Sequence, residues 1–349
     1  MLTHWNERGL ADLLADHDLG GLGDRGEMAF PNDGWSGATL SQFQRGSERF
    51  ILKRTSWAVD WIARATRDHA LREGFVATGQ LPLPPTVVAP YLGAAADGTE
   101  VGMLMPDLSH DLLVWERPDG APTVDAATLD RVLAAVAALH ATPLSDELVA
   151  AWPWCPLRER LLLLSPGSAS QFEADGVAAG TRFRAGWEAF GERAPRAANE
   201  LVARLDEDPA PLLTALATLP PALLHGDLKV ANVAPLPDGR TAFIDWQMVM
   251  VAPVAVDLGW LLVANSSAFA EAPDDVLARY VAIAASSSPA IRDGWPVTRD
   301  LALITGLLLR GWRKGLDAAA GGRLASGIAA VDDLAWWGAS AVEAADRRL

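Results

Sequence analysis

The 349-residue chain has a single cysteine, Cys155, and therefore cannot build an intrachain disulfide framework. No group of cysteines and histidines has the spacing of zinc ligands. The N-terminal segment carries acidic side chains and lacks the long apolar stretch of a signal peptide. We therefore expect a protein of a reducing compartment, with a cytoplasmic location.

Positive charge and long apolar runs are also scarce. Lys and Arg number 29 against 44 Asp and Glu, which gives a formal net charge of −15 at pH 7. A nucleic-acid surface needs a basic patch, so we expect no nucleic-acid partner. The longest apolar runs, such as residues 301–309, are far shorter than a membrane span, so we expect no membrane partner. The acidic balance favours solubility, and it is also compatible with a cationic small substrate.

The overall composition, with 50% hydrophobic and 21% charged residues, is typical of a globular protein. A chain of this length favours two lobes. Strand-like alternation is common up to Met105, and helical periodicity dominates beyond it. We therefore expect an α+β fold, with a small β-rich lobe at residues 1–105 and a larger, mainly α-helical lobe at residues 106–349.

Local patterns in the N-terminal part predict individual elements. Helices are expected over residues 1–20 and 57–78, where apolar residues recur with helical spacing. Strands are expected at residues 87–88 and 101–105, on either side of a turn at Asp97-Gly98.

The C-terminal part is predicted to be mostly helical. A loop is expected over residues 165–170, which are rich in Ser, Pro and Gly. The region 152–215 is a candidate substrate lid, and a plain helical insertion is equally consistent with its pattern. Helices are expected over residues 126–142, 154–164, 172–199 and 200–219, after Asp257, and near 273–287, 296–316 and 328–347.

Two glycine-rich turns precede the first predicted strands. The G-x-G-x-x-G at residues 21–26 follows an acidic helical segment instead of a strand, so we interpret it as a linker. The second turn, at residues 34–37, contains Gly34, Ser36 and Gly37 and leads into alternating residues. Small residues at such a tip let backbone N–H groups approach phosphate oxygens, although an ordinary hairpin loop explains the turn alone.

A lysine and a glutamate of the N-terminal part form a candidate pair. Lys53 ends an apolar strand, from which it could reach nucleotide phosphates, whereas an edge lysine is usually solvated. Glu73 lies in the predicted helix that follows and could pair with Lys53. Asp60 and Asp68 are alternatives that the spacing does not exclude.

The most informative segment covers residues 223–246. An apolar run leads to a turn with Asp227, Asn232 follows five residues later, and a second apolar run ends on Asp245 after a Pro/Asp/Gly turn. Two acids and an amide therefore lie on two loops joined by a short β-hairpin. Taken singly they are ordinary turn and cap residues. Together, three converging oxygen donors suit Mg²⁺.

The order of these features resembles the protein-kinase-like fold. A glycine turn, a strand lysine, a helix glutamate, a hinge and a long helix precede H-x-D-x-x-x-x-N and an apolar run ending in Asp. His225-Gly226-Asp227 stands in place of His-Arg-Asp, and Ile244-Asp245-Trp246 in place of Asp-Phe-Gly. The chain is thereby similar to the aminoglycoside phosphotransferase and choline kinase branch of small-molecule kinases. The resemblance covers the chain from about residue 30 onward, and its specific motifs lie within residues 223–260.

The resemblance implies a bilobal fold, ATP and Mg²⁺ as cofactors, and transfer of the γ-phosphate to a hydroxyl. It implies that Asp227 orients or deprotonates that hydroxyl, while Asn232 and Asp245 hold Mg²⁺. Lys53, positioned by Glu73, would contact the α- and β-phosphates.

The resemblance extends to the surroundings of the site. The turn at residues 34–37 would cover the phosphates, and Met105 and Asp107 would belong to a hinge against adenine. His225 would pack the loop, and Asp257 would bond its backbone without taking part in the chemistry. Lys229, two residues after Asp227, could neutralise charge on the transferred phosphoryl group, or it could be a solvated loop lysine.

The acceptor is left open by these motifs. We expect a small-molecule hydroxyl compound, with an aminoglycoside or another cationic natural product, and hence antibiotic resistance, as one candidate. An amino sugar or a choline-like, macrolide or homoserine-like alcohol is an alternative. A nucleotide-binding pseudokinase scaffold is a second class, although every expected catalytic position is filled. A protein kinase is disfavoured, because residues 247–256 are too short for a regulated loop and contain no Ala-Pro-Glu-like element.

Overall fold

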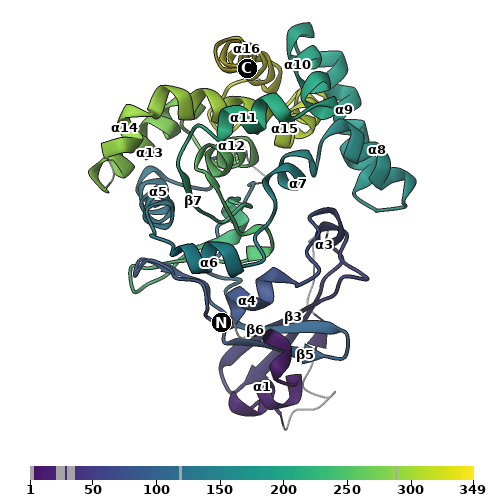
Figure 1. Cartoon of the computed structure of the whole chain (residues 1–349), viewed down its shortest axis with the longest axis vertical. Helices are drawn as coiled ribbons and strands as arrows, with labels where there is room; N and C mark the ends of the chain where they lie inside the picture. Colours follow the sequence, from purple (N-terminus) through teal and green to yellow (C-terminus); the bar gives the residue numbers. More distant parts are fainter. Residues whose placement is uncertain (1–3, 21–27, 30–35, 118–119, 288) are drawn as a thin grey trace.

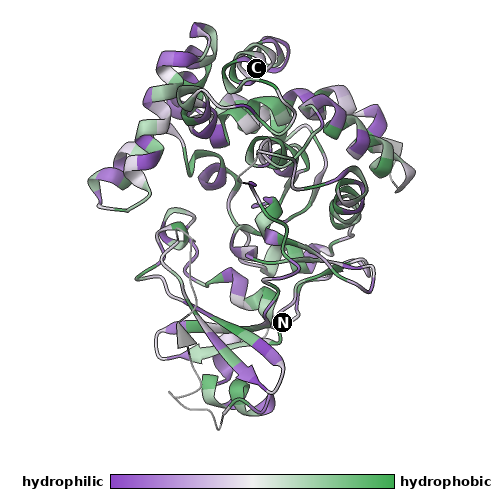
Figure 2. Cartoon of the chain, turned by 180° about the vertical axis from the view of Figure 1, so that it is seen from behind, coloured by the Kyte–Doolittle hydropathy of each residue, from purple (hydrophilic) through white to green (hydrophobic). Residues whose placement is uncertain are grey.

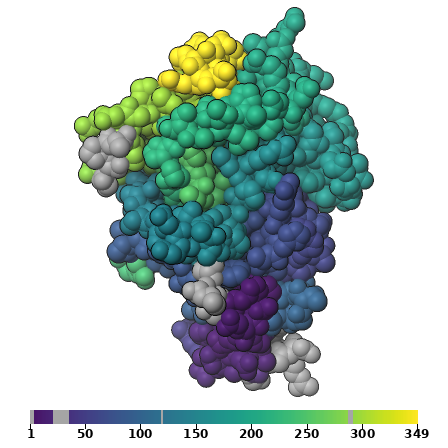
Figure 3. Space-filling model, in the orientation of Figure 1, coloured from purple at the N-terminus to yellow at the C-terminus, as the bar shows by residue number. Residues whose placement is uncertain are grey.

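The computed structural model describes residues 4–20, 28–29, 36–117, 120–287 and 289–349 (Figure 1). A small lobe built on a β-sheet lies at one end, and a larger helical lobe lies at the other. The space-filling view shows the N-terminal residues at the tip of the small lobe and the last helix at the opposite end (Figure 3). The glycine motif at residues 21–26 lies outside the described residues, and so does Gly34.

The small lobe contains a five-stranded antiparallel sheet in the order β1-β2-β3-β6-β5. Alternate residues of the long strands point to one face, where Phe43, Phe50 and Leu104 pack against Leu13 of a helix that covers the sheet. The strands are β1 (Met28–Ala29), β2 (Thr39–Arg45), β3 (Glu48–Thr55), β5 (Gly93–Asp97) and β6 (Glu100–Pro106). The last strand, β6, ends one residue after the predicted lobe boundary, and the division into two domains stays a prediction.

The predicted helix over residues 1–20 is wrong in its extent. A 3-10 turn, η1 (Trp5–Glu7), and a helix, α1 (Leu10–Asp16), are separated there because Gly9 forms a β-bridge to Ala96 of the sheet.

The predicted helix over residues 57–78 is also divided, into α3 (Trp61–Ala65) and α4 (Arg72–Ala77). Between them Arg67 and Leu71 adopt positive φ angles of 53° and 54°, which no α-helix accommodates.

The strand before the Asp97-Gly98 turn differs from the prediction. The Asp97-Gly98 turn joins β5 to β6. The strand that was expected before this turn, at residues 87–88, is β4 (Val87–Val88), and it pairs in parallel with β9 (Thr241–Phe243) of the large lobe. Pro90 and the residues beside it separate β4 from the turn, so β4 is free to join another sheet.

Short strands organise the centre of the large lobe. β7 (Pro221–Leu224) pairs with β10 (Met250–Pro253), and β8 (Val233–Pro235) forms a hairpin with β9 (Thr241–Phe243). The predicted hairpin between Asn232 and Asp245 is therefore present. Its strand β9 also pairs with β4, which connects the two lobes.

Helices surround these strands. The amphipathic colouring of the outer helices in Figure 2, with hydrophilic and hydrophobic residues alternating along each, fits helices that cover a core on one side only. α12 is buried along its whole length and packs beside α15. The helices are α5 (Ala126–His140), α6 (Asp146–Ala151), α7 (Leu157–Leu162), α8 (Pro166–Ala174), α9 (Gly180–Arg193), α10 (Arg196–Glu207), α11 (Ala210–Leu216), α12 (Ala255–Ala264), α13 (Pro273–Ser287), α14 (Pro289–Asp293), α15 (Trp295–Ala320) and α16 (Ala330–Arg348).

The predicted loop over residues 165–170 is instead the first part of α8. Ser165 caps this helix by accepting a hydrogen bond from the N–H of Ser168, and Pro166 occupies its first position. Serine before proline is a helix-start signal, which outweighs the loop-like composition. Among the described helices, none is both long enough and apolar enough to cross a membrane.

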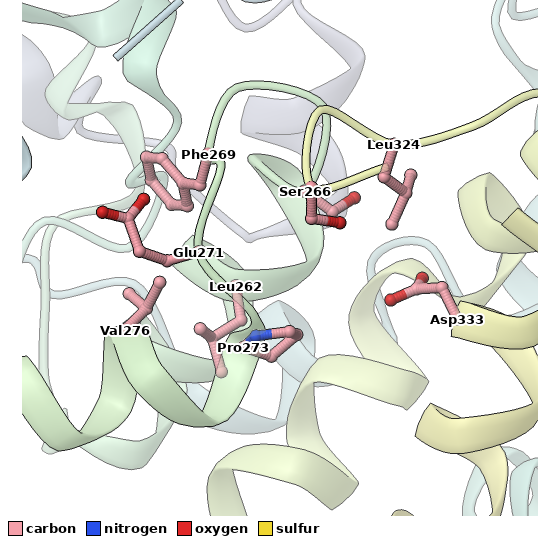
Figure 4. Close-up of a pocket in the computed structure, with 9 residues that line it drawn as sticks. Leu262, Ser266, Phe269, Glu271, Pro273, Val276, Leu324 and Asp333 are labelled. Carbon is pink, nitrogen blue, oxygen red and sulfur yellow. The ribbon is translucent and has the colours of Figure 1, made fainter. Parts of the chain in front are cut away.

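A buried ion pair joins the last two long helices. Lys314 of α15 contacts Asp333 of α16, both side chains are almost fully buried, and the ammonium lies 5.0 Å from the centre of the Trp337 ring. Asp333 also borders a cavity of about 10 Å³, which is room for about one water molecule (Figure 4). Removing one partner of such a pair leaves an uncompensated buried charge.

Asp333→Ala is therefore expected to lower the free energy of unfolding by about 3–5 kcal/mol, measured by chemical denaturation. The neighbouring Asp332 is exposed, so Asp332→Ala should change the free energy of unfolding by at most about 1 kcal/mol. The double variant Lys314→Met/Asp333→Leu should recover most of the loss. Equal losses for Asp333→Ala and Asp332→Ala would contradict the proposed importance of the pair.

Candidate active site

Two loops of the large lobe bring four polar side chains together. Asp227 and Lys229 follow β7, Asn232 precedes β8, and Asp245 follows β9. Lys229 Nζ lies 3.0 Å from Asp227 Oδ2 and 3.9 Å from Asp245 Oδ2. Asn232 Nδ2 donates to the main-chain oxygen of Asp227 at 3.0 Å and to its Oδ2 at 3.1 Å. Asp227 and Asn232 are each only 5% exposed, so the arrangement is firmly held.

The loop that carries Asp227 requires a glycine at position 226. Gly226 has a φ angle of 80°, and a Cβ atom there would lie 2.0 Å from the main-chain oxygen of Met248. The buried carboxylate of Asp257 accepts hydrogen bonds from the N–H groups of His225 at 3.0 Å and Gly226 at 2.8 Å. The expected role of Asp257 in bonding this backbone is thus present in the structure.

His225 connects the two loops. Its Nδ1 accepts from the N–H of Asp227 at 3.2 Å, which leaves the proton on Nε2 to be donated to the main-chain oxygen of Ile244 at 3.0 Å. Complete burial lowers the pKa of His225, so the neutral ring is favoured. This geometry supports the expected packing role and gives His225 no access to a substrate.

Lys53 of β3 completes the site from the small lobe. Its Nζ lies 2.7 Å from Glu73 Oε2 and 2.7 Å from Asp245 Oδ1, although 192 residues separate Lys53 from Asp245. The expected pairing of Lys53 with Glu73 is therefore present. The alternatives are engaged elsewhere, since Asp60 caps α3 and Asp68 accepts from the N–H of Arg72.

The charges of the site stabilise one another. Burial alone would raise the pKa of Asp245, but the ammonium groups of Lys53 and Lys229 outweigh burial and hold it well below its usual range. For Asp227 burial is likewise outweighed, mainly by Lys229, and its pKa is lowered. Burial would lower the pKa of Lys53, but Asp245 and Glu73 raise it. Both aspartates are therefore carboxylates at neutral pH.

The predicted phosphate-covering turn is described only in part. Gly37 has a φ angle of 95°, and a Cβ atom there would lie 2.5 Å from the main-chain oxygen of Val59. The main-chain oxygen of Ser36 accepts from the N–H of Trp61 at 3.2 Å, which holds the turn against the start of α3. A contact of this turn with phosphates stays a prediction.

The predicted hinge lies at the end of β6. Met105 is buried and pairs with Ile51 of β3. The carboxylate of Asp107 accepts from Gln42 Nε2 at 2.9 Å and from the N–H of Ser109 at 2.9 Å, so this side chain ties the hinge to the sheet. A contact of Met105 or Asp107 with a nucleotide base stays a prediction.

Oxygen atoms suited to a metal ion are present, but the protein supplies few. Among the described residues, no group of three or more His, Cys, Asp or Glu side chains could hold a metal ion by itself. Both side-chain hydrogen bonds of Asn232 are donated by Nδ2, so the amide oxygen Oδ1 remains available to a metal ion. One amide oxygen and the Asp245 carboxylate match Mg²⁺, which typically takes one or two protein ligands together with phosphates and waters.

Some residues that build the site have no local signal in the sequence. Tyr91 donates its hydroxyl hydrogen to Glu73 Oε1 at 2.6 Å and accepts from the N–H of Asp245 at 3.2 Å. Arg160 of α7 donates from Nε to the main-chain oxygen of Gly226 at 2.8 Å. These contacts span 18 to 154 residues and arise only from the tertiary fold.

The fold and this site together define a kinase-like phosphotransferase. The family model of the phosphotransferase enzyme family, APH, matches residues 31–301, and the chain belongs to this family. It is therefore a phosphotransferase that acts on hydroxyl groups of small molecules. No curated protein sequence matches the chain.

Solved structures with a similar fold include three small-molecule kinases. The choline kinase from Cryptosporidium parvum has 11% identity and a TM-score of 0.51, with 97% of this chain and 94% of that chain covered. This likeness agrees with the predicted α+β protein-kinase-like fold, which is confirmed.

The aminoglycoside phosphotransferase APH(3'')-Id from Streptomyces rimosus has 19% identity and a TM-score of 0.46, over 83% of this chain and 95% of its own. The macrolide 2'-phosphotransferase from Brachybacterium faecium has 20% identity and a TM-score of 0.42, over 95% and 96%.

Lys53→Met tests the central ion pairs through the pH dependence of stability. In the wild type the lowered pKa of Asp245 means that its stabilising contribution is present above the unfolded pKa, about 3.9, and is lost as the pH falls through the folded pKa. Without Lys53, Glu73 loses its cation and Asp245 keeps only the more distant Lys229, so the free energy of unfolding should fall by about 3 kcal/mol at pH 7. Protonation relieves this repulsion, so the deficit should shrink as the pH is lowered towards 4.

Denaturant unfolding of both proteins at pH 7, 5.5 and 4.5 measures this deficit. Arg196→Met, which removes an exposed ion pair with Glu200, should cost about 0.5 kcal/mol or less. A deficit for Lys53→Met that stays constant with pH would mean that only packing was lost.

Proposed function

We propose that the protein is an ATP- and Mg²⁺-dependent O-phosphotransferase, which moves the γ-phosphate of ATP to a hydroxyl group of a small-molecule acceptor. The observation that carries this proposal is the 2.7 Å contact between Lys53 of the small lobe and Asp245 of the large lobe, beside Asp227 and Asn232. In this position the lysine could contact the α- and β-phosphates of ATP, while the carboxylate could bind the Mg²⁺ ion that accompanies the phosphates. We also propose the lobes at residues 1–105 and 106–349 as its nucleotide-binding and catalytic domains.

Asp227 is proposed to orient the acceptor hydroxyl. Its two side-chain contacts, to Lys229 and Asn232, both use Oδ2, so Oδ1 remains to accept a hydrogen bond from the substrate. Because its pKa is lowered, the carboxylate is ionised at neutral pH and acts mainly by positioning the hydroxyl in line with the phosphoryl group.

Lys229 is proposed to neutralise charge on the transferred phosphoryl group. Its ammonium lies between the carboxylates of Asp227 and Asp245 and its side chain is 26% exposed, so it borders the space where the two substrates meet. This position favours a role in the chemistry over that of a solvated loop lysine.

Asn232 and Asp245 are proposed to hold Mg²⁺. When bound, the ion would supply charge neutralisation for the phosphates. Lys53, fixed by Glu73, is proposed to contact the α- and β-phosphates, with residues 34–37 above them and Met105 and Asp107 near the adenine. The acceptor is proposed to be a small alcohol, in a cytoplasmic enzyme. Solved structures of similar fold are named for aminoglycosides, macrolides and choline as their substrates, and these names do not decide which alcohol this chain phosphorylates.

Substitutions at the two proposed catalytic positions, Asp227 and Lys229, and at the proposed metal ligand Asp245 should separate binding from chemistry. Asp227→Asn should lower kcat by about 10²–10⁴-fold with ATP·Mg²⁺ affinity retained. Lys229→Met should lower kcat by about 10²–10³-fold and affect ATP affinity less. Asp245→Asn should abolish both turnover and the Mg²⁺ dependence of nucleotide binding.

The measurement combines nucleotide titration calorimetry with ADP release in the presence of antibiotics, amino sugars and amino alcohols, and mass detection of the added phosphate. Arg240→Met, at the exposed tip of the β8–β9 hairpin, is the matched control and should behave as the wild type. Near-full turnover by Asp245→Asn with a verified acceptor would show that its assignment is wrong. ATP binding without any phosphorylated acceptor would favour a scaffold.

A further inference from the structure

Two arginine side chains are buried next to the site with N–H groups that lack partners. Arg160 is 0% exposed, and apart from the bond of Nε to Gly226 its Nη1 and Nη2 have no hydrogen-bond partner in the described structure. Arg310 is 4% exposed, and its Nε is likewise buried without a partner. Neither guanidinium forms an ion pair with an acidic side chain among the described residues.

The two guanidinium groups share one aromatic wall. The centre of the Trp260 ring lies 4.3 Å from Cζ of Arg160 and 5.1 Å from Cζ of Arg310, and Trp115 lies 4.6 Å from Arg310. Stacking satisfies the faces of a guanidinium but not the N–H groups at its edge. Arg310 also interrupts α15, with φ −148° and ψ 20°, so the helix is kinked at this residue.

The charge balance around these groups is unfavourable in the absence of a ligand. Burial, reinforced by the neighbouring Arg313, lowers the pKa of Arg310 to about 9, so the group still carries its charge at neutral pH. Arg313 is itself paired with Asp317 and Glu116. Asp227 attracts both buried arginines, but its Oδ2 is already engaged by Lys229 and Asn232. Buried unpaired charges are costly, and a bound anion would remove the cost.

We propose that Arg160 and Arg310 bind an oxyanion, a carboxylate or a phosphate, that belongs to the acceptor. This inference rests on the proposed function, because it assigns the ligand of the same site. Guanidinium N–H groups match the spacing of carboxylate and phosphate oxygens, and Trp260 provides a flat wall for both. Arg160 bonds the main-chain oxygen of Gly226, the residue before Asp227, and Arg310 shares the Trp260 ring with it, so such an anion would lie close to the loop that carries Asp227.

The preferred acceptor is accordingly a hydroxy acid or an alcohol that already carries a phosphate. Two buried cations would repel an ammonium group placed at the same position. The chain as a whole is acidic, which is compatible with a cationic substrate, but the two buried arginines make the local charge at the proposed anion site positive.

Binding of inorganic phosphate tests the anion site directly. We expect phosphate to raise the melting temperature of the wild type more than chloride at equal ionic strength. Arg310→Gln and Arg160→Lys should weaken phosphate binding by roughly 10- to 100-fold, because charge-assisted hydrogen bonds are lost. Arg313→Gln, one turn further along α15, is the matched control and should keep the response. Lys53→Met should also keep the rise in melting temperature with phosphate, which distinguishes the anion site at Arg160 and Arg310 from the nucleotide site.

The melting temperature of Arg310→Gln without ligand distinguishes an anion site from a purely structural role for Arg310, because loss of a structural residue would lower it. The proposal expects Arg310→Gln without ligand to melt no lower than the wild type, because a buried charge without a partner is removed. A lower melting temperature together with an unchanged phosphate response would overturn the proposal.

Matched acceptors test which substrate carries the anion. Hydroxy acids are compared with their amides, and sugar phosphates with the free sugars, by ADP release and mass detection. We expect turnover of the anionic member of a pair, and Arg310→Gln should raise its KM at least about tenfold with ATP·Mg²⁺ affinity unchanged. Equal turnover of neutral or cationic members, insensitive to Arg310→Gln, would overturn the proposal and leave the phosphotransferase function intact. If ATP·Mg²⁺ does not bind, the proposed function fails instead, and the phosphate measurement still decides the anion site.

Discussion

The pairing of Lys53 with two carboxylates is the interaction on which the rest of the site depends. Glu73 holds the ammonium from its own lobe, and Asp245 meets it from the other lobe, each at 2.7 Å. Tyr91 bonds both to Glu73 and to the backbone of Asp245, so the same point is fixed a second time. Because one cation satisfies two acids, the lobes are held at a separation that leaves Asp227, Lys229 and Asn232 facing the same space.

A second constraint acts through the backbone of the large lobe. Asp257 holds the two N–H groups before Asp227, and His225 reaches from that loop to the loop of Asp245. The left-handed conformation and the contact with Met248 exclude any side chain at position 226. The proposed chemistry thus needs few side chains, and the buried polar groups behind them set their positions.

Much of this arrangement was predictable from the sequence, because its signals are local. The spacing of Asp227, Asn232 and Asp245 around a Pro/Asp/Gly turn predicted the hairpin and the convergence of oxygen atoms. From strand and helix periods alone, Glu73 was one of three possible partners for Lys53, because these periods do not determine relative placement. The family resemblance is what singled out Glu73. Arg160, Arg310 and Tyr91 could not be found, because their contacts depend on tertiary packing. The start of α8 differs from the predicted loop because the local helix-start signal of Ser165-Pro166 outweighs the Ser, Pro and Gly content of residues 165–170.

We propose that the nucleotide, the metal ion and the carboxylate of Asp227 meet between the lobes. A crystal structure with Mn²⁺ and a non-hydrolysable ATP analogue tests it most directly, because the anomalous signal locates the metal independently of the protein phases. We expect a metal peak bonded to Asn232 Oδ1, the Asp245 carboxylate and phosphate oxygens, with Lys53 on the α- and β-phosphates. A nucleotide bound away from Lys53, or a metal peak without Asp245 as a ligand, would contradict it.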